Sequence, residues 1–587
     1  MTRLLDWLHD PPEDTGISFR TGNTWRRRDY HHLAEATLRV AGALTEAGVR
    51  PGAAVSVVLP TGPEFVAAFF GALAAGATPN PLAPPALFAD TARHTEQTAR
   101  RLRTARPAAV VTDTAGLTHV EAARDRAGLV APVLTGERVA RATPLTVPRA
   151  PARAALLQFT SGSSGEPRAI EVGRENLESN LAGIARWLGM RPGDLTATWL
   201  PVHHDMGLIG CLLAPVVTGT GILALSPAEF VRSPLLWLEC FGALGATLTA
   251  TPAFGLSHVL RQVERRPEAL DGWDFGHWRS VIVGAERVDP ELLDRFARAL
   301  RPRGFAPEAL CPAYGLAEST LAVTGVHPGR AVRTVLRPDA AHAPAPAPTP
   351  LTTPDRPTTS PATSPAVSRS ARVVGCGPPI AGAELRILAE DGTELPEGHL
   401  GTIAVRGPGV AHRALGPAGP RPIADADGWL LTGDSGLLRD GELFVVGRLG
   451  DALKVRGTTV FAEDVENEVA LRLGLPPFRV VALLGTVGST DTVIVLIEGR
   501  APRDPAPDGA AGPWDAVATV VRRHVGAGVH RRLFHGPTGC VERTTSGKPR
   551  RRAMWRRLTG PDPTGVTEYR PRPPVPLGPV PLGSEAP

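Results

Sequence analysis

The chain has 587 residues, of which 63 are basic and 58 acidic, for a formal net charge of +5. This is about four times a typical domain length, so we expect more than one folded unit. The small positive excess does not favour a nucleic-acid-binding protein, and an apolar fraction of 43% excludes both a fully disordered chain and a membrane-embedded one.

Helical and strand-like patterns alternate from residue 33 to about residue 260, which predicts a mostly parallel β-sheet covered by helices. Buried strands are expected at residues 53–60, 107–113, 155–159 and 281–283, with a helix rich in small residues at 64–76. Residues 206–225 carry no charge, but they contain several glycines and lack flanking arginines. They predict a buried helix followed by a buried strand, not a membrane-spanning helix.

The second half of the chain changes character along its length. Residues 341–370 contain eight prolines and predict a disordered, low-complexity insertion. Strands are expected again at 383–388 and 401–406, and Asp440-Gly441 predicts a hairpin turn. We expect an N-terminal domain over residues 1–446, a smaller α/β domain over 447–559 and a proline-rich, disordered tail over 560–587.

Cysteine and lysine are both used sparingly. The five cysteines are widely spaced, odd in number and without a CxxC pair, which argues against a zinc site or a disulfide framework and fits a reducing cytoplasm. The acidic N-terminus lacks the apolar stretch of a signal peptide. Only two of the 63 basic residues are lysines, Lys454 and Lys548. A compact ammonium at these two places indicates either chemistry that arginine cannot perform or chance survival under compositional bias.

Residues 160–168, TSGSSGEPR, directly follow a predicted strand. Glycines let the backbone approach an anion, hydroxyls donate hydrogen bonds, and a helix expected from about Asn176 would add free amides. The stretch lacks the Gly-Lys-Ser/Thr ending of a Walker loop. A lone Ser/Gly stretch is more often a flexible turn, but its place after a strand favours a phosphate-binding loop.

This loop resembles the phosphate loop of the adenylate-forming enzymes, which include acyl-CoA synthetases, luciferases and peptide-synthetase adenylation domains. Further matches follow in the family's order: WLPVHHDMGLIG at 199–210, VGAER at 283–287, AYGLAEST at 313–320, WLLTGDSG at 429–436, ELFVVGRLGDALKVRG at 442–457 and TTSGK at 544–548. The HHDMGLIG and AYGLAE forms, with EFVAAFFGALAAGATPNPL at 64–82, are similar to the fatty acyl-AMP ligase branch. That branch activates a fatty acid as acyl-adenylate and passes it to the phosphopantetheine thiol of a carrier protein.

The resemblance implies ATP and Mg²⁺ as cofactors and assigns roles to the matching residues. Phosphates would be held by Thr160, Ser161, Gly162, Ser163, Ser164 and Gly165. Adenine would lie against Tyr314 and Gly315 and the backbone of Gly284, Ala285 and Glu286. Glu318 would bind Mg²⁺, a hard cation that prefers oxygen ligands. Asp434 and Arg448 would contact the ribose, and Lys548 would bridge the substrate carboxylate and the α-phosphate.

The acyl site is expected around the HHDMG motif. The family often uses the position of His204 to gate or line this site, although a structural histidine is nearly as common there. Trp199, Met206 and Ile209 would line the acyl tunnel, and ordinary core packing is at least equally compatible with them. The aspartate that anchors an α-amino group in amino-acid adenylation domains has no match, which favours a plain carboxylic acid.

Several positions depart from the family pattern. Ser164 replaces a threonine, Arg168-Ala169 replaces Lys-Gly, and Gly450 stands where the hinge usually carries lysine or aspartate. Lys454 lies where some relatives place a lysine that serves the second half-reaction, and it fits a surface lysine equally well. The insertion at 341–370 lies near a branch-specific insertion thought to disfavour CoA, but its low complexity argues against that role.

The predicted fold class is therefore α/β, with a large N-terminal domain of parallel α/β sheets, a small β-barrel subdomain and a mobile C-terminal lid. The expected function is that of a fatty acyl-AMP ligase that loads a separate carrier protein of a polyketide or peptide synthase. An acyl-CoA synthetase and a catalytically idle adenylate-binding module are the alternatives. Residues 541–560 contain seven basic residues and one acidic residue, which indicates either a docking face for an acidic carrier or a solvated helix face.

Overall fold

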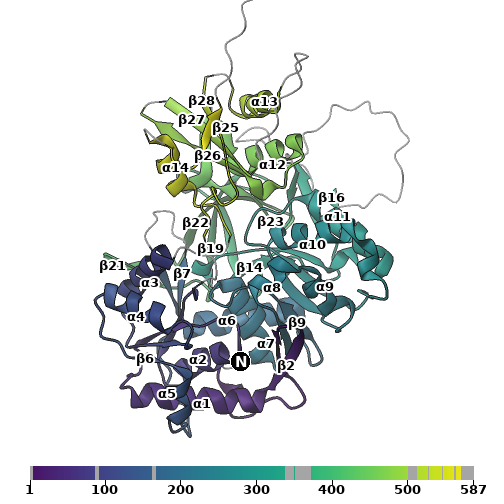
Figure 1. The fold of residues 1–587 in the computed structure, drawn as a ribbon. Coiled ribbons are helices and arrows are strands. Elements are labelled where there is room, and N and C mark those ends of the chain that lie inside the picture. The colour runs from purple at the N-terminus through teal and green to yellow at the C-terminus, as the bar shows by residue number, and fades with distance from the viewer. Residues whose placement is uncertain are drawn as a thin grey trace, which may run out of the picture. The chain divides into compact units, whose positions relative to one another are not determined.

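The computed structural model describes residues 4–85, 91–160, 167–336, 349–350, 372–455, 458–488, 490–499, 512–526, 528–544, 547–560 and 563–569. They belong to two compact units: the first comprises the described residues up to Gly450 together with Gly547, and the second comprises the other described residues from Asp451 onward (Figure 1). Residue 447, the predicted start of the second domain, lies inside strand β23 (Glu442–Arg448).

The largest sheet of the first unit has eight strands in the order β14-β13-β12-β11-β9-β10-β1-β2. Their bounds are β1 Gly16–Thr21, β2 Thr24–Asp29, β9 Leu195–Thr198, β10 Gly221–Ala224, β11 Leu248–Thr251, β12 Ser280–Val283, β13 Leu310–Gly315 and β14 Ala322–Gly325. All pairs from β1 to β13 are parallel, and only the edge strands β2 and β14 are antiparallel. The carboxyl ends of parallel strands meet at one edge, which is where such sheets bind ligands.

A second, fully parallel sheet has the order β4-β3-β5-β6. It comprises β3 (Ala54–Val58), β4 (Thr78–Pro81), β5 (Ala109–Thr112) and β6 (Val133–Leu134), with helices α1 (Tyr30–Glu46), α2 (Pro63–Ala74), α3 (Thr91–Ala105), α4 (Leu117–Arg126) and α5 (Gly136–Arg141). Helix α2 is buried along its whole length after its first turn. A side chain at Gly71 would meet Val40 of α1 at 2.7 Å, so the small residues predicted in this helix allow the two helices to pack closely.

Antiparallel sheets complete the first unit. One has the order β21-β20-β8-β7, another β18-β19-β22-β23 and a third β16-β15-β17. Their strands are β7 Ala154–Thr160, β8 Arg168–Gly173, β15 Arg333–Leu336, β16 Thr349–Pro350, β17 Arg372–Val374, β18 Glu384–Leu388, β19 Gly401–Arg406, β20 Arg413–Gly416, β21 Gly419–Pro422, β22 Leu430–Arg439 and β23. Asp440 and Gly441 join β22 to β23 with φ of 52° and 72°, as a type I′ hairpin turn requires. The predicted α/β class is confirmed.

The remaining helices of the first unit cover the large sheet. They are α6 Arg174–Leu188, α7 Ala214–Thr218, α8 Pro227–Arg232, α9 Leu235–Gly242, α10 Ala253–Arg265 and α11 Pro290–Leu300. The uncharged stretch forms the π-helix η2 (Met206–Leu213), then α7 and the buried strand β10, as its pattern predicted. No helix in the part of the chain that the structure describes combines the length and apolar character needed to cross a bilayer.

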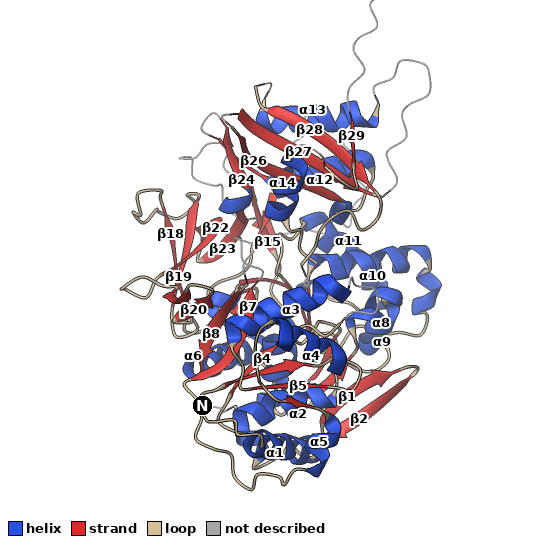
Figure 2. Cartoon of the chain, turned by 60° about the vertical axis from the view of Figure 1, so that its left-hand side comes forward, coloured by secondary structure: helices blue, strands red, loops and turns tan. Residues whose placement is uncertain are grey.

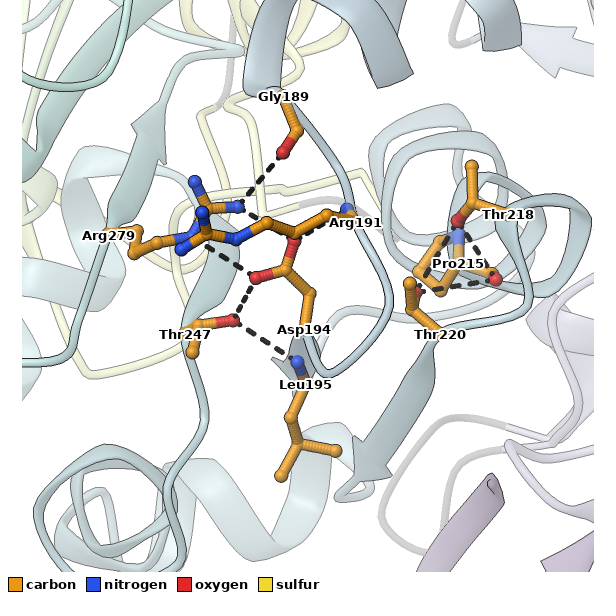
Figure 3. A network of polar contacts seen from close by, with 9 residues as sticks. All are labelled: Gly189, Arg191, Asp194, Leu195, Pro215, Thr218, Thr220, Thr247 and Arg279. Atoms are coloured by element: carbon orange, nitrogen blue, oxygen red, sulfur yellow. Dashed lines mark hydrogen bonds and ion pairs between the residues drawn. The ribbon is translucent and has the colours of Figure 1, made fainter. Parts of the chain in front are cut away.

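Three polar side chains lie at the amino ends of adjacent strands of the large sheet (Figure 3). Asp194 precedes β9, Thr247 precedes β11 and Arg279 precedes β12. The Asp194 carboxylate accepts hydrogen bonds from Arg279 Nη2 at 2.7 Å and Nε at 3.1 Å, and from Thr247 Oγ1 at 3.0 Å. This buried network fixes the strands at the edge opposite to their carboxyl ends.

The second unit contains a hairpin and a four-stranded sheet. The hairpin pairs β24 (Ala452–Val455) with β25 (Thr458–Phe461), and the sheet has the order β26-β27-β28-β29. The sheet strands and helices are β26 Val480–Val487, β27 Thr490–Glu498, β28 His530–Gly536, β29 Thr567–Tyr569, α12 Ala462–Leu473, α13 Pro513–Val525 and α14 Arg551–Thr559. Alternate residues of β26 and β27 pack against α12 and α13 on one face and against α14 on the other (Figure 2).

Two predicted disordered segments need correction. The tail was expected to be disordered from residue 560, but Thr567–Tyr569 form β29, where Tyr569 stacks on Trp514 with ring centroids 5.2 Å apart. Within the insertion at 341–370, Thr349–Pro350 pair with β15. Both strands are very short and gain their stability from a partner strand, which local composition does not reveal. The other residues of the insertion lie outside the described residues.

Candidate active site

The predicted adenine-binding residues lie at the carboxyl ends of β12 and β13. A side chain at Gly284 would approach the Ala313 carbonyl oxygen to 2.9 Å, and one at Gly315 would overlap the Leu321 carbonyl. Ala285 has a φ of 68°, a left-handed conformation that is strained for alanine. Glycine at the first two positions lets neighbouring backbone pack closely, and the strained Ala285 marks a tight turn, at the edge where parallel sheets bind ligands.

Glu286 contributes to this edge through a structural contact. Its Oε1 accepts a hydrogen bond from Phe254 N at 2.8 Å, at the first turn of α10, whose N-cap is Pro252 and offers no capping side chain. The Glu286 side chain therefore satisfies an end of α10, and the backbone of the predicted segment remains the part available to a ligand.

Tyr314, Asp434 and Arg448 form one polar cluster. The Tyr314 hydroxyl donates to Asp434 Oδ2 at 2.7 Å, and Arg448 Nε lies 3.2 Å from Asp434 Oδ1. Asp434 and Arg448 are opposite each other in the β22–β23 pair, while Tyr314 is the second-last residue of β13. Burial, together with the Asp434 charge, raises the pKa of Tyr314 well above its usual range. The residues predicted for adenine and ribose are thus in direct contact.

The two partners of Asp434 differ in exposure. The Asp434 side chain is 14% exposed and that of Arg448 is 53% exposed. An exposed arginine holds its ion pair weakly, so Arg448 can turn toward a ligand while the Tyr314 hydroxyl keeps Asp434 in place. This arrangement suits a carboxylate that receives hydrogen bonds from sugar hydroxyls.

Glu318 lies close to this cluster, in the short helix η6 (Ala317–Ser319). Burial raises the pKa of Glu318, the Asp205 and Asp434 charges raise it further, and Arg448 opposes them. No group of three or more His, Cys, Asp or Glu residues in the described ranges could hold a metal ion alone. A carboxylate near two others fits Mg²⁺, which usually takes one or two carboxylates and completes its shell with phosphate oxygens and water.

Asp205 was given no role from the sequence, although it lies inside the HHDMG motif. Its Oδ1 accepts from Met206 N at 2.8 Å and caps η2, and its charge acts on Glu318. A π-helix is rare and is often found at functional sites. Asp205 therefore belongs both to the predicted acyl region, where it caps the π-helix η2, and to the group of carboxylates around Glu318.

The two histidines of this motif lie together, with ring centroids 4.6 Å apart. Burial lowers the pKa of His203 well below its usual value, so its ring is neutral. The Gln158 side chain of β7 donates from Nε2 to the His203 carbonyl at 3.0 Å, which ties the motif to the strand before the phosphate loop. A gating or lining role for His204 stays a prediction.

The residues predicted to line the acyl tunnel have the contacts of core residues. Trp199 stacks on Phe230 with centroids 3.9 Å apart and planes at 5°, and Met206 packs against the same apolar cluster. Ile209 is fully buried in a different cluster. The alternative of core packing explains Trp199 and Ile209, and their contact with an acyl chain stays a prediction.

The phosphate loop itself lies mostly outside the described residues, which include Thr160 but not Ser161, Gly162, Ser163, Ser164 or Gly165. Its flanks require a correction. Thr160 pairs with Arg168 in the antiparallel β7–β8 pair, so the loop joins two strands. Residues 168–173 form β8, which was not predicted, and α6 begins after it at Arg174, close to the expected Asn176.

Both lysines belong to described parts of the second unit. Lys548 is exposed, and its backbone pairs with Thr544, whose N–H donates to the Lys548 carbonyl at 2.8 Å and whose Oγ1 accepts from Lys548 N at 3.1 Å. Lys454 is exposed in β24, opposite Thr459. Their catalytic roles stay predictions.

Comparison with known proteins identifies the family. The AMP-binding enzyme family matches residues 6–413. A Caulobacter vibrioides protein named "Putative acyl-CoA synthetase" is 31% identical over 93% of each chain. Long-chain-fatty-acid–AMP ligase FadD26 of Mycobacterium marinum is 31% identical over 88% of each chain.

Solved structures agree with the sequence relatives. One from structural and functional studies of fatty acyl-adenylate ligases of E. coli and L. pneumophila has a TM-score of 0.79 and 28% identity, and it covers 94% of this chain and 96% of its own. A fatty acyl-adenylate ligase from L. pneumophila, in complex with acyl adenylate and pyrophosphate, has a TM-score of 0.66 and 25% identity, covering 97% of this chain and 98% of its own. The chain belongs to the AMP-binding, adenylate-forming enzymes and, within them, to the fatty acyl-AMP ligase branch of acyl-activating ligases.

Proposed function

We propose that the protein activates a fatty acid with ATP and then passes the acyl group to the phosphopantetheine thiol of a carrier protein. In the first step a carboxylate oxygen attacks the α-phosphorus of ATP, the bond to the bridging oxygen breaks, and pyrophosphate leaves. In the second step the thiol sulfur attacks the acyl carbon and AMP leaves. The observation that carries the proposal is the Tyr314–Asp434–Arg448 cluster beside Glu318.

The residues of the first unit would bind and orient the nucleotide. Adenine would lie against the backbone near Gly284 and Gly315, at the carboxyl ends of β12 and β13, and Asp434 would accept hydrogen bonds from the ribose. Mg²⁺ held by Glu318 would neutralise charge on the phosphates. Lys548 would supply positive charge where carboxylate and α-phosphate meet, because stabilising developing charge is the main requirement of this chemistry.

The relatives point to two candidate acceptors of the acyl group. Fatty acyl-AMP ligase names among the relatives support a carrier protein, whereas the name of the Caulobacter relative supports CoA. An acyl-CoA synthetase is therefore the second candidate. The contact between Tyr314 and Asp434, together with an exposed Lys548, argues against a catalytically idle module.

The decisive experiment measures pyrophosphate release with saturated fatty acids of increasing length, with Lys548→Ala as the inactive control. Thioester formation is then compared between CoA and a holo-carrier protein. The proposal expects pyrophosphate release that needs Lys548 and transfer to the carrier. Efficient transfer to CoA would replace it with the acyl-CoA synthetase, and an intact protein that turns over no fatty acid would refute the adenylation step.

We also infer that the protein works in a reducing compartment such as the cytoplasm. All five cysteines are buried free thiols, and burial raises the pKa of Cys211 to about 11 and that of Cys376 to about 12. Such thiols are inert and act as packing residues.

A further inference from the structure

The second unit contains a buried network of one arginine and three carboxylates. Arg551 Nη1 lies 3.2 Å from Asp451 Oδ2, and its Nη2 lies 2.9 Å from both carboxylate oxygens of Glu466 and 3.6 Å from Glu463 Oε1. The four side chains are between 11% and 22% exposed. The network joins Asp451, which directly precedes β24, to helix α12 and to the first residue of α14.

The composition of this ion network indicates that it fixes the relative positions of its elements and adds little stability. A buried ion network adds little net stability because the cost of removing charges from water offsets their attraction, and its best-attested use is to fix register. Three carboxylates also outnumber the single guanidinium, and burial with its neighbours Glu466 and Asp451 raises the pKa of Glu463 to about 7. An apolar cluster at the same place would stabilise the second unit equally well, and it would not require such exact side-chain geometry.

The network connects two positions that matter for the proposed reaction, the start of the second unit and the segment that carries Lys548. Asp451 is the first residue of the second unit, and Arg551 follows Lys548 by three residues. The segment between them is short and braced, because Arg543 and Pro549 form a β-bridge and Arg550 N donates to the Glu542 carbonyl at 2.7 Å.

We propose that Arg551 is a positioning residue for Lys548: its planar guanidinium fixes the segment that carries Lys548 relative to Asp451, where the second unit begins. The inference rests on the proposed adenylation. The distance from Asp451 to the Lys548 segment then sets where the ammonium arrives when the second unit meets the nucleotide site. We expect lysine to replace Arg551 poorly, because its donors lie on a single nitrogen, whereas Arg551 meets Asp451 through Nη1 and Glu466 through Nη2.

The test compares Arg551→Lys with a matched control, Arg532→Lys. Arg532 also makes a two-pronged ion pair in the second unit, with Glu568 at 2.6 and 2.9 Å, and its side chain is 20% exposed. Its hydrogen bonds and ion pairs reach neither Asp451 nor the described residues Thr544, Gly547 and Lys548. A loss caused only by weakening the second unit would therefore appear in both variants.

For Arg551→Lys we expect kcat of pyrophosphate release to fall by on the order of a hundredfold with KM for ATP unchanged, since a misplacement of about 1 Å costs that much. Transfer from pre-formed acyl-adenylate to free pantetheine, a thiol that needs no docking face, should keep its rate, because we assign Lys548 no part in that chemical step. In a Lys548→Ala background the same substitution should lower adenylation no further.

The other possible results would contradict either the positioning role of Arg551 or the proposed function. Equal adenylation by Arg551→Lys and wild type, or equal losses in Arg551→Lys and Arg532→Lys, would overturn the positioning role. A multiplied loss in the double variant would show that Arg551 acts independently of Lys548 and would also overturn it. A wild-type enzyme that adenylates no fatty acid would refute the proposed function instead.

Discussion

Removing the Asp194 carboxylate should destabilise the first unit without altering its chemistry. Asp194 is 4% exposed and accepts from Arg279, from Thr247 and from Arg191 N at 2.9 Å. These contacts connect the amino ends of β9, β11 and β12, whereas Gly284 and Gly315 lie at the carboxyl ends. Asp194→Ala therefore perturbs the sheet at the edge away from the site.

The expected loss of unfolding free energy in Asp194→Ala depends on the two side chains that lose their partner, Arg279 and Thr247. Breaking a buried ion pair by removing one member costs about 3–5 kcal/mol, because the other charge stays buried. The Arg279 side chain is 25% exposed, so water recovers part of this cost, while Thr247 loses its acceptor. We expect a loss of roughly 3 kcal/mol. Asp271→Ala is the control, since Asp271 pairs with Arg303 but is 75% exposed, and its loss should stay below about 1 kcal/mol.

Urea unfolding followed by tryptophan fluorescence measures this effect, because eight of the ten tryptophans lie in the first unit. The transition of that unit is analysed separately, since a chain of two units need not unfold in one step. Pyrophosphate release per folded enzyme should stay within about twofold of wild type, because the site keeps its contacts. An unchanged midpoint for Asp194→Ala, or a large fall in activity without a stability loss, would refute the reasoning.

Four further outcomes follow from the site and the second unit. Tyr314→Phe removes a hydrogen bond to the Asp434 carboxylate and should raise KM for ATP about tenfold, a cost of about 1.4 kcal/mol, in steady-state kinetics. Glu318→Gln should raise the Mg²⁺ concentration needed for half-maximal pyrophosphate release, and an unchanged titration contradicts the metal role. Lys548→Arg should lower kcat of adenylation strongly despite its conserved charge, and unimpaired turnover would exclude the proposed bridge. Because the pKa of Glu463 is raised from 4.5 to about 7, the second unit should lose stability as pH rises from about 4.5 to about 7 and then level off, a dependence that urea titrations should find absent in Glu463→Gln.

Local patterns predicted elements whose stability is also local. Residues 401–406 form β19 with the expected bounds, and the Asp440-Gly441 turn carries the positive φ angles that its residue types allow. Strand β8 was missed because RAIEVG is a short stretch whose stability comes from pairing with β7 and β20. The strand at Thr567–Tyr569 was not predicted for the same reason. The ion pair of Glu568 and the stack of Tyr569 on Trp514 are formed with residues that are distant in the sequence.

The site residues also include some that the sequence predicted and one that it did not. Tyr314, Asp434 and Arg448 were found through motifs, and the structure adds that they contact one another across 120 residues of chain. Asp205 lay inside a recognised motif but had no role, because its effect on Glu318 depends on a distance that only folding creates. Motifs thus identify residues that meet the ligand, and they pass over residues that act through another side chain.

The basic run at 541–560 illustrates how folding reassigns charge. Four of its seven basic residues form ion pairs within the second unit: Arg543 with Glu498, Arg550 and Arg557 with Glu542, and Arg551 with its three carboxylates. The exposed charges that remain are Lys548, Arg552 and Arg556. A carrier protein that docks here would meet three cations rather than seven, and one of them is the lysine proposed for adenylation. Docking and adenylation would then compete for Lys548, which favours acceptor binding after the acyl-adenylate has formed.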